Sequence, residues 1–523
     1  MKILVTVALI AGSLMSSAHA APSPNKNKKP VMTEAGTPPD AGTPMTYEEF
    51  EKAVKDAQTR GARGTANVDV ALESALSDSF RNLRNEIIGG PKFADGKETG
   101  EKFPGITTPT QLHDLLKRLN DDNYYNKLSP DAQFAAAQMT PFIAMRAIFN
   151  RAMRLIEPSP FSHLQSVTAL RAMATGVMVY LPTKQWEAGI QYMVVPSDDM
   201  GKDIADENAL HRYFEEELVQ VLAKMATRLE QLNFASKPIY FDNKVFYGTA
   251  EFTNQQDRYV RLGEPERRLA LANAYATLSN LESLNAYNLN GFFKAVDALA
   301  KNAGLASALG FNPDRTTSKK RFSIIRGINN SDGLFNLRPG GNVWMVNAYT
   351  NFTKSVTNGI LAWKELRARA NDSSSVNSAS NAYGVALDPR AVLGADRVLA
   401  ITSSNLGYIV TGKGKERLGS AVVNSEGRQI SLYNFFGNPP KSLIDLMPDK
   451  FDETPYNQTA QINGKARTWH NYLAGRPVGW PVQEYQKIFP EVRTSADIPF
   501  TARVLSQSWG GWVLGIPMSS VLL

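Results

Sequence analysis

The stretch LHRYFEEELVQVLAKMATRLEQL, residues 210–232, carries the most regular helical pattern in the chain. Its apolar residues recur every three or four positions, and they are Leu210, Phe214, Leu218, Val221, Leu222, Met225, Leu229 and Leu232. This period puts them on one face of an α-helix and leaves charged residues on the other. Such a face has to be buried, so the stretch predicts a helix inside a mainly helical domain.

Patterns on both sides of this stretch predict further helices. Thr46 and Glu49 form a capping box, and Ser129 followed by Pro130 has the composition of a helix start. Gly89-Gly90-Pro91 is a stop signal, and Thr140-Pro141 is expected to interrupt a helix. The predicted helices cover residues 46–58, 68–88, from 109 onward, 134–156, 164–178, 210–232 and 265–287.

Short strands are expected between and after these helices. Residues 191–195 are predicted to be a strand, and residues 239–241 and 245–247 flank a tight turn that predicts a hairpin. Residues 371–382 contain five Ser and three Asn, which marks an internal boundary. After it, the segments 398–402, 407–411, 418–423 and 429–435 predict an antiparallel meander. We therefore expect a mainly α, multi-domain α+β protein with a smaller antiparallel β-containing C-terminal part.

The N-terminus has the pattern of a bacterial secretory signal. Lys2 is followed by an apolar run over residues 3–15 and by Ala18-x-Ala20, the small-residue pattern of a cleavage site. Residues 21–45 are rich in proline, so we expect an extended linker there. The predicted division is a signal peptide at 1–20, this disordered linker at 21–45, an N-terminal helical region at 46–128, and a central helical domain with short β-hairpins at 129–370. A C-terminal β-meander with an aromatic-rich irregular region is predicted at 384–523.

Composition narrows the functional classes. The chain has 523 residues, 43% hydrophobic and 20% charged, which is typical of a globular protein with a sizeable core. It contains no cysteine, so disulfides, thiol nucleophiles and cysteine-based metal sites are excluded. The net charge of +7 is spread thinly, and its short basic clusters do not form a nucleic-acid-binding stripe. No segment after the signal peptide predicts a transmembrane helix.

Two motif fragments resemble ligand-binding sites, but neither is predicted to bind a ligand. The run from Gly407 to Lys413 resembles a phosphate-binding loop, but Gly414 replaces the required Ser or Thr, so a hairpin turn is predicted. His211 and Glu215 have the i, i+4 spacing that lets two side chains face one metal ion. Acidic residues surround them, and a solvated helix face is the favoured interpretation. We predict no metal site and no cofactor.

The C-terminal aromatic residues are the most suggestive candidate site. They could line a groove for a peptide or a glycan, with arginines nearby, or they could anchor irregular segments to the core. The anchoring alternative is favoured. The candidate partner-binding residues are Trp469, His470, Tyr472, Arg476, Trp480, Trp509 and Trp512.

The sequence favours a non-catalytic function. We expect an exported bacterial cell-envelope protein, in the periplasm, at the cell surface or secreted, that binds or scaffolds an envelope protein or a cell-wall polymer. Its basic clusters would allow peripheral contact with an anionic surface. The alternative is a hydrolase acting on an envelope polymer or a secreted substrate. For that alternative, the acidic residues that could form a hydrolytic pair are Asp198, Asp199, Asp449, Asp452 and Glu453.

Overall fold

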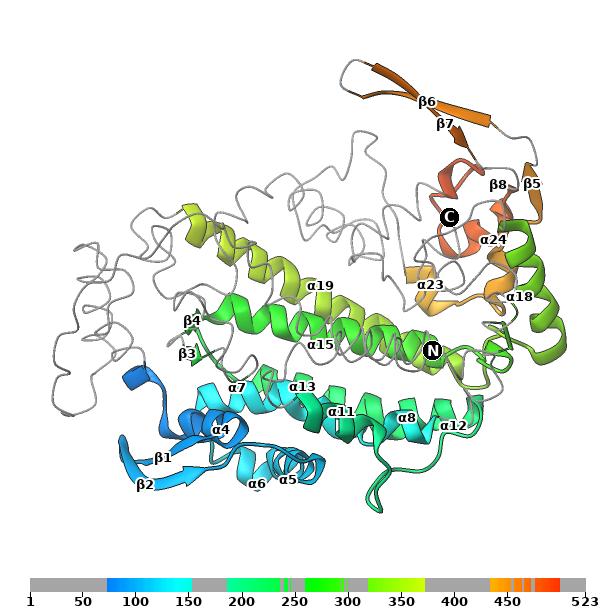
Figure 1. Cartoon of the computed structure of the whole chain (residues 1–523). Coiled ribbons are helices and arrows are strands. Elements are labelled where there is room, and N and C mark those ends of the chain that lie inside the picture. The colour runs from blue at the N-terminus through cyan, green and yellow to red at the C-terminus, as the bar shows by residue number, and fades with distance from the viewer. Residues whose placement is uncertain are drawn as a thin grey trace.

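The amphipathic stretch at 210–232 lies in one continuous helical run of the computed structural model (Figure 1). The run consists of α12 (Glu207–Arg212), the π-helical segment η3 (Tyr213–Leu218) and α13 (Val219–Gln231). Asp206 caps it, because its carboxylate accepts a 2.7 Å hydrogen bond from the backbone N–H of Ala209. The expected apolar face is buried at Leu210, Phe214, Leu218, Leu222, Met225, Leu229 and Leu232.

The structure describes most of the central and part of the C-terminal chain. The described residues are 73–152, 186–235, 239–242, 245, 259–292, 294–295, 298, 318–371, 433–452, 456–462, 465–471 and 476–498. The predicted signal peptide, linker and first helix lie outside them. So do the predicted helix at 164–178, the boundary segment after residue 371, and the meander as far as residue 432.

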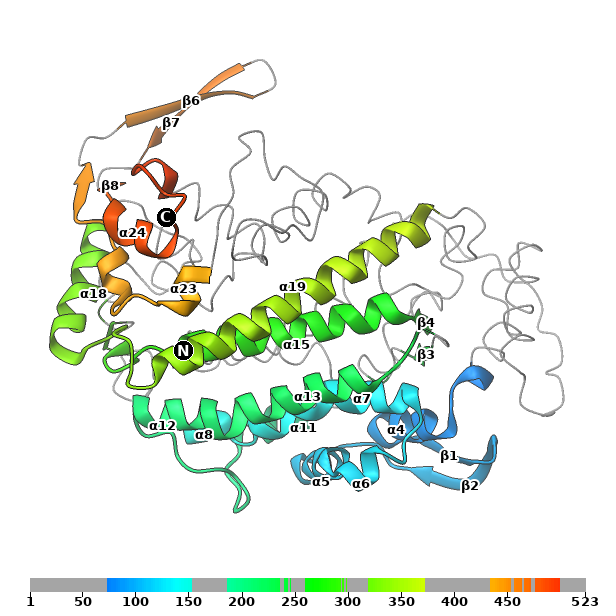
Figure 2. The same cartoon turned by 180° about the vertical axis from the view of Figure 1, so that it is seen from behind.

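Two long helices, α15 (Glu264–Asn285) and α19 (Gly341–Asn371), lie along each other above the 207–231 run (Figures 1 and 2). They are antiparallel, since the backbone N–H of Arg338, just before α19, donates 2.9 Å to the carbonyl of Ala286, just after α15. Along the pair, the hydroxyl of Ser355 donates 2.5 Å to the carbonyl of Ala272. Residues on most sides of α15 are buried, because the helix lies between α13 and α19.

Shorter helices complete the layer that contains α13. These are α7 (Pro130–Met139), the 3-10 segment η1 (Thr140–Met145), α8 (Ile148–Arg151) and α11 (Trp186–Val194). The expected interruption at Thr140-Pro141 is confirmed, since α7 ends at Met139. Proline cannot donate the N–H that an α-helix would use there.

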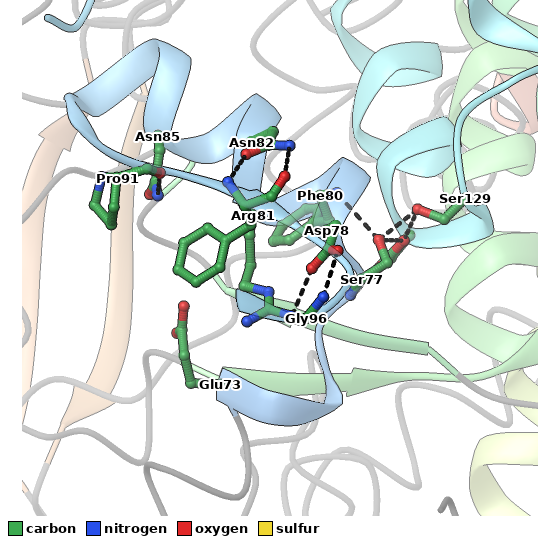
Figure 3. Close-up of polar contacts among 12 residues, drawn as sticks. Glu73, Ser77, Asp78, Phe80, Arg81, Asn82, Asn85, Pro91, Gly96 and Ser129 are labelled. Atoms are coloured by element: carbon green, nitrogen blue, oxygen red, sulfur yellow. Dashed lines mark hydrogen bonds and ion pairs between the residues drawn. The ribbon is translucent and has the colours of Figure 1, made fainter. Parts of the chain in front are cut away.

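A small helix and hairpin unit forms the N-terminal end of the described chain. It contains α4 (Asp78–Ile88), the antiparallel strands β1 (Gly90–Ala94) and β2 (Lys97–Phe103), α5 (Pro109–Asn120) and α6 (Asp122–Tyr125). Asn82 exchanges two hydrogen bonds with the backbone of Phe93, at 2.9 and 2.7 Å, and Asn85 donates 2.6 Å to the carbonyl of Pro91 (Figure 3). Side-chain amides of α4 therefore form hydrogen bonds with backbone groups of β1 and hold the hairpin against the helix.

The starts of α4 and α7 meet at one carboxylate. Ser77 and Ser129 are the N-cap residues of these helices, and their hydroxyls lie together in Figure 3. Asp131 is 6% exposed and accepts hydrogen bonds from the Ser77 N–H at 3.0 Å, the Ser77 hydroxyl at 2.7 Å and the Ser129 hydroxyl at 2.5 Å. The contact joins segments about fifty residues apart in the chain and fixes how the two helices start.

Three C-terminal elements pack on the beginning of α19 and the end of α15: α23 (Tyr433–Gly437), the 3-10 segment η6 (Leu443–Leu446) and α24 (Val482–Ile488). The helix α18 (Ser318–Asp332), which precedes α19 in the chain, contacts η6 and β8 (Arg476–Gly479), and β8 pairs with β5 (Lys450–Asp452). A second apolar cluster forms there, separate from the larger core around α13 and α15. In it, Phe435 and Phe489 stack with ring centroids 5.9 Å apart and planes 4° apart.

Between β5 and β8 the chain forms a long hairpin. Its strands are β6 (Tyr456–Ile462) and β7 (Lys465–Asn471), paired antiparallel over their full length. Among the described strands, β6 and β7 pair only with each other. The hairpin extends beyond the β5–β8 pair in both views (Figures 1 and 2).

The predicted fold class is confirmed as mainly α with small antiparallel sheets. Four local predictions were wrong. The strand at 191–195 is instead the end of α11, because Ala188 and Tyr192, spaced as helical neighbours, are both buried. The helix predicted at 68–88 is broken before Asp78, where Ser77 starts a new helix.

The other two corrections concern strands. Residues 239–242 form β3, but their partner is β4 (Tyr259–Leu262) rather than 245–247. The buried Asp242 of β3 lies 2.8 Å from the guanidinium of Arg84, a contact that a local turn pattern cannot reveal. The strand predicted at 429–435 is helical from Tyr433, because the aromatic residues of α23 pack onto α19.

Candidate functional site

The predicted C-terminal binding residues lie in different places. Trp469 and His470 are on β7 of the extended hairpin, and Arg476 is the first residue of β8. Trp480 follows β8. Tyr472, Trp509 and Trp512 lie outside the described residues. Within the described part of the chain, Trp469 and His470 are thus consecutive residues of one strand, and Arg476 and Trp480 lie at the two ends of the β8 segment.

Trp480 fits the anchoring alternative at its own position. Its side chain is 7% exposed and lies edge-on to Tyr485 of α24, with ring centroids 6.2 Å apart. Tyr485 is fully buried, and burial raises the pKa of its hydroxyl. Both rings belong to the second apolar cluster, where they hold the C-terminal elements against α19.

A second candidate site, which we call the His211 junction, consists of His211, Glu215, Asn285 and Arg338. The prediction that His211 lies on a solvated helix face was wrong, since the residue is 1% exposed. Glu215 lies one turn along, in the π-helical segment η3. π-Helical segments are rare and occur frequently at functional sites. The junction joins the 207–231 run to the end of α15 and the residues before α19.

Hydrogen bonds join the four side chains of the junction. Asn285 Nδ2 donates 2.8 Å to the Glu215 carboxylate, which can only accept, so Asn285 Oδ1 faces His211. His211 Nδ1 lies 2.6 Å from that oxygen and 2.9 Å from Arg338 Nη1, so it donates to the amide in one tautomer and accepts from the guanidinium in the other. Arg338 completes the set, with Nη1 3.0 Å from Glu215 Oε1 and 2.9 Å from the carbonyl of Asn285.

The other ring nitrogen of His211 is buried. Among the described residues, none forms a hydrogen bond with His211 Nε2. Burial, and then the positive charge of Arg338, lower the pKa of His211 to about 4 against the opposing effects of Asn285 and Glu215. The ring is therefore neutral near pH 7, and Nε2 can form one hydrogen bond. Nowhere in the described chain do three His, Cys, Asp or Glu side chains cluster as a metal site would require.

A third polar cluster contains His113, Ser197 and Asp199, the side chains of a catalytic triad. Their order differs from that of a working triad. His113 Nε2 lies 2.8 Å from Asp199 Oδ2, while the hydroxyl of Ser197 contacts the other oxygen of Asp199. The carboxylate thus stands between serine and histidine, so this histidine does not contact the serine it would need to activate. Arg146 Nε lies 3.2 Å from the carboxylate of Asp199. The hydrogen bond from Ser197, and then the interactions with His113 and Arg146, lower the pKa of Asp199.

Glu282 is the most perturbed carboxyl group in the helical core. It lies on α15, is 5% exposed, and accepts a 2.7 Å hydrogen bond from the side-chain amide of Asn351 on α19. Burial without a cation raises its pKa to about 7, and the Asn351 amide offsets this only in part. A carboxyl group with such a pKa can give and take protons near neutral pH.

One open cavity of about 570 Å³ lies beside α24. Its wall combines polar and apolar groups and carries both charges, and Lys487 in it is paired with Glu484 at 2.6 Å. The lining residues are Asn438, Pro439, Pro440, Lys441, Asp445, Glu484, Lys487 and Ile488.

Sequence reasoning missed most of these groups for a common reason. Asn285, Arg338 and Glu282 belong to no local motif, and their roles depend on segments about seventy residues or more away. One signal was present: His211 stands between two residues of the apolar face, Leu210 and Phe214, which is an unusual place for a solvated side chain.

Comparison of this chain with known families, proteins and structures found no match. Neither a protein-family model, nor a curated protein, nor a solved structure matches this chain. Among the helices that the structure describes, none is both long and apolar enough to cross a membrane.

Proposed function

We propose that this chain is an exported bacterial cell-envelope protein that binds or scaffolds an envelope partner without catalysing a reaction. The export part of the proposal rests on the sequence of residues 1–20, with Lys2, the apolar run and Ala18-x-Ala20. The proline-rich residues 21–45 would then form an extended linker between the new N-terminus at Ala21 and the folded body.

The observation that carries the binding part is the β6–β7 hairpin. It extends from the β5–β8 pair, carries Trp469 and His470, and pairs with no other described strand (Figure 1). Two strands alone are marginally stable in water, so a hairpin of this length gains most when a partner covers it. Aromatic residues are enriched where proteins bind partners.

The test combines processing with crosslinking in cells. A photo-crosslinking amino acid at Asn471 of β7 should capture an envelope component, whereas the same probe at the exposed Lys117 of α5 should not. N-terminal sequencing of this chain, isolated from the crosslinked complex, should begin at Ala21. An intact Met1 chain in the cytoplasm, or equal capture from both positions, would contradict the proposal.

A hydrolase acting on an envelope polymer is the second candidate, and Glu282 is the observation that favours it. A buried carboxyl group that titrates near pH 7 is typical of a general acid. The Glu282→Gln variant separates the candidates. Loss of polymer hydrolysis together with unchanged folding would favour the hydrolase, whereas a more stable protein with unchanged crosslinking would favour the binding protein.

A further inference from the structure

The open cavity beside α24 has the size of a site for a small organic ligand. Its volume is about 570 Å³, and such sites commonly measure about 300–1,000 Å³. Part of its wall is the face of α24 that carries Glu484, Lys487 and Ile488, spaced three or four residues apart. The rest of the wall consists of residues 438–441 and Asp445. The cavity is therefore formed by α24 and by the segment that leads from α23 into η6.

Both parts of the wall are fixed by the fold. Tyr485 of α24 is fully buried in the second apolar cluster, so the helix cannot rotate without exposing this ring. The segment before η6 is fixed by a 3.3 Å hydrogen bond from the Tyr287 hydroxyl to the carbonyl of Pro440. A second hydrogen bond of 2.7 Å joins the backbone N–H of Leu337 to the carbonyl of Lys441. A site held in this way loses little entropy when a ligand binds.

Two charged side chains of the wall are available to a ligand. Glu484 and Lys487 form an ion pair at 2.6 Å, so each largely neutralises the other. Lys441 and Asp445 are exposed, and neither side chain forms an ion pair or a hydrogen bond with any part of the described chain. The cavity therefore presents one free ammonium group and one free carboxylate group.

The charges of the wall balance, which narrows the class of ligand. The wall contains two basic and two acidic residues: Lys441, Lys487, Asp445 and Glu484. A ligand with several negative charges would be repelled by the two carboxylates, and a polyamine would be repelled by the two ammonium groups. A ligand with one charged group of each sign can pair with Lys441 and Asp445 at once. The balance favours a zwitterion.

We propose that this cavity binds a zwitterionic peptide of two or three residues. The carboxylate of the peptide would pair with Lys441 and its ammonium group with Asp445. Such a peptide separates its ends by up to about 7–11 Å, at about 3.3–3.6 Å per residue, whereas a free amino acid holds both groups on one carbon atom. Separated ends suit two side chains that do not pair with each other. Asn438 provides an amide that can hydrogen-bond the peptide group, and Pro440 provides apolar surface.

The test titrates the full chain with alanyl-leucine and follows binding by ligand-observed NMR. For a ligand of this size we expect a dissociation constant on the order of 1 mM. N-acetylation removes the ammonium charge of the dipeptide, and amidation removes its carboxylate charge. Each modification should weaken binding about tenfold, because one charge-assisted hydrogen bond is lost. Free leucine, inorganic phosphate and putrescine should also bind about tenfold more weakly than the dipeptide.

Two variants of the cavity should respond to these modifications in opposite ways. Lys441→Gln should weaken alanyl-leucine binding about tenfold and make it insensitive to amidation, while N-acetylation still weakens it. Asp445→Asn should make binding insensitive to N-acetylation, while amidation still weakens it. The reason is that each variant removes the partner of only one end of the peptide. Both side chains are exposed, so the melting temperature of each variant should match the parent.

Matched controls lie a few residues away in the chain. Lys450 and Asp449 are exposed, and they do not line the cavity. Lys450→Gln and Asp449→Asn change the net charge by the same amounts as the two cavity variants. Because exposed charges outside the site contribute little, these controls should leave the binding of alanyl-leucine within about twofold of the parent.

Four results would each overturn the inference. The first is no binding of alanyl-leucine at ten times the expected dissociation constant. The second is equal binding of the unmodified, acetylated and amidated dipeptides. The third is tighter binding of free leucine, phosphate or putrescine than of the dipeptide. The fourth is an equal loss of binding in Lys441→Gln and in the control Lys450→Gln.

The inference goes beyond the proposed function, since the cavity is lined by other residues than those of the β6–β7 hairpin. The proposed function is tested separately, through processing at Ala21 and crosslinking from Asn471. A chain that is exported and captures an envelope component, but binds no dipeptide, would disprove only the peptide site.

Discussion

Replacing Glu282 by Gln should stabilise the protein above neutral pH. Glutamine keeps the shape of the side chain and an oxygen to accept the hydrogen bond from Asn351, but it removes the buried negative charge. The pKa of Glu282 is raised in the folded protein from 4.5 to about 7. One pKa unit is worth about 1.4 kcal/mol, so the folded protein loses up to about 3 kcal/mol when this carboxyl group ionises.

The sign of the effect follows from linkage. A carboxyl group with a raised folded-state pKa contributes its full stability below pH 4.5 and loses it as pH rises through about 7. The variant should therefore gain up to about 3 kcal/mol over the parent at pH 8 and almost nothing at pH 4.5. Urea unfolding followed by circular dichroism at pH 4.5, 6 and 8 measures this difference.

His211 also makes the stability of the parent protein depend on pH. Its folded-state pKa is lowered from 6.5 to about 4, so its stability is present above pH 6.5 and is lost as pH falls toward 4, by up to about 3 kcal/mol. The contributions of Glu282 and His211 to the free energy of unfolding change with pH in opposite directions. In the parent protein they largely cancel between pH 4.5 and 6.5. In Glu282→Gln the loss of stability toward acid, due to His211, should become visible.

Glu264 provides a matched control on the same helix. It pairs with Arg267 and Arg268, and these partners lower its pKa in spite of its burial. Glu264→Gln should therefore destabilise the protein at pH 8 and matter less at low pH, the reverse of Glu282→Gln. If Glu282→Gln destabilises at pH 8, or if its effect does not shrink toward pH 4.5, then the carboxyl group is stabilised by a partner that this reasoning omits.

Four further experiments test other parts of the reasoning. N-terminal sequencing of the exported protein should find Ala21, and finding Met1 would disprove cleavage. Trp480→Ala should cost about 3–5 kcal/mol in urea unfolding through lost packing, and a loss below about 1 kcal/mol would show that the ring is no anchor. Asp131→Ala should cost about 2–3 kcal/mol, because it removes the shared acceptor of two helix starts. Gly201→Ala should cost about 1–3 kcal/mol, because the new Cβ would lie 2.5 Å from Arg151 Nη2, whereas Gly327→Ala in α18 meets no atom within 4 Å and should stabilise slightly.

The sequence predicts the helices of this protein better than its strands. The apolar period at 210–232, the start at Ser129-Pro130 and the interruption at Thr140-Pro141 are local signals, and local chemistry decides them. The strand expected at 191–195 was wrong because the four apolar residues after Gln191 fit either structure, and packing against α5 and α8 favours a helix. The partner of β3 is set by a segment about twenty residues away.

The candidate sites likewise divide into residues that local sequence indicates and residues whose role depends on distant segments. Trp469 and His470 are candidates from composition, because aromatic residues near arginine are visible in the sequence alone. Asn285 and Arg338 were not found, since they gain their roles only when α15 and the residues before α19 reach His211. The misreading of His211 followed from judging it by its acidic neighbours in sequence, while its neighbours in space are an amide and a guanidinium.

Buried polar contacts recur where separate helical segments meet. His211 bonds Asn285 across 74 residues, Asn351 bonds Glu282 across 69, and Arg84 bonds Asp242 across 158. Apolar faces alone would tolerate a helix shifted by one turn, because leucine packs against leucine in either position. A shift would leave these polar groups buried and unpaired, at a cost of about 1–3 kcal/mol each. We infer that in a chain without cysteine the apolar faces supply most of the stability, and that these contacts select the alignment of the helices.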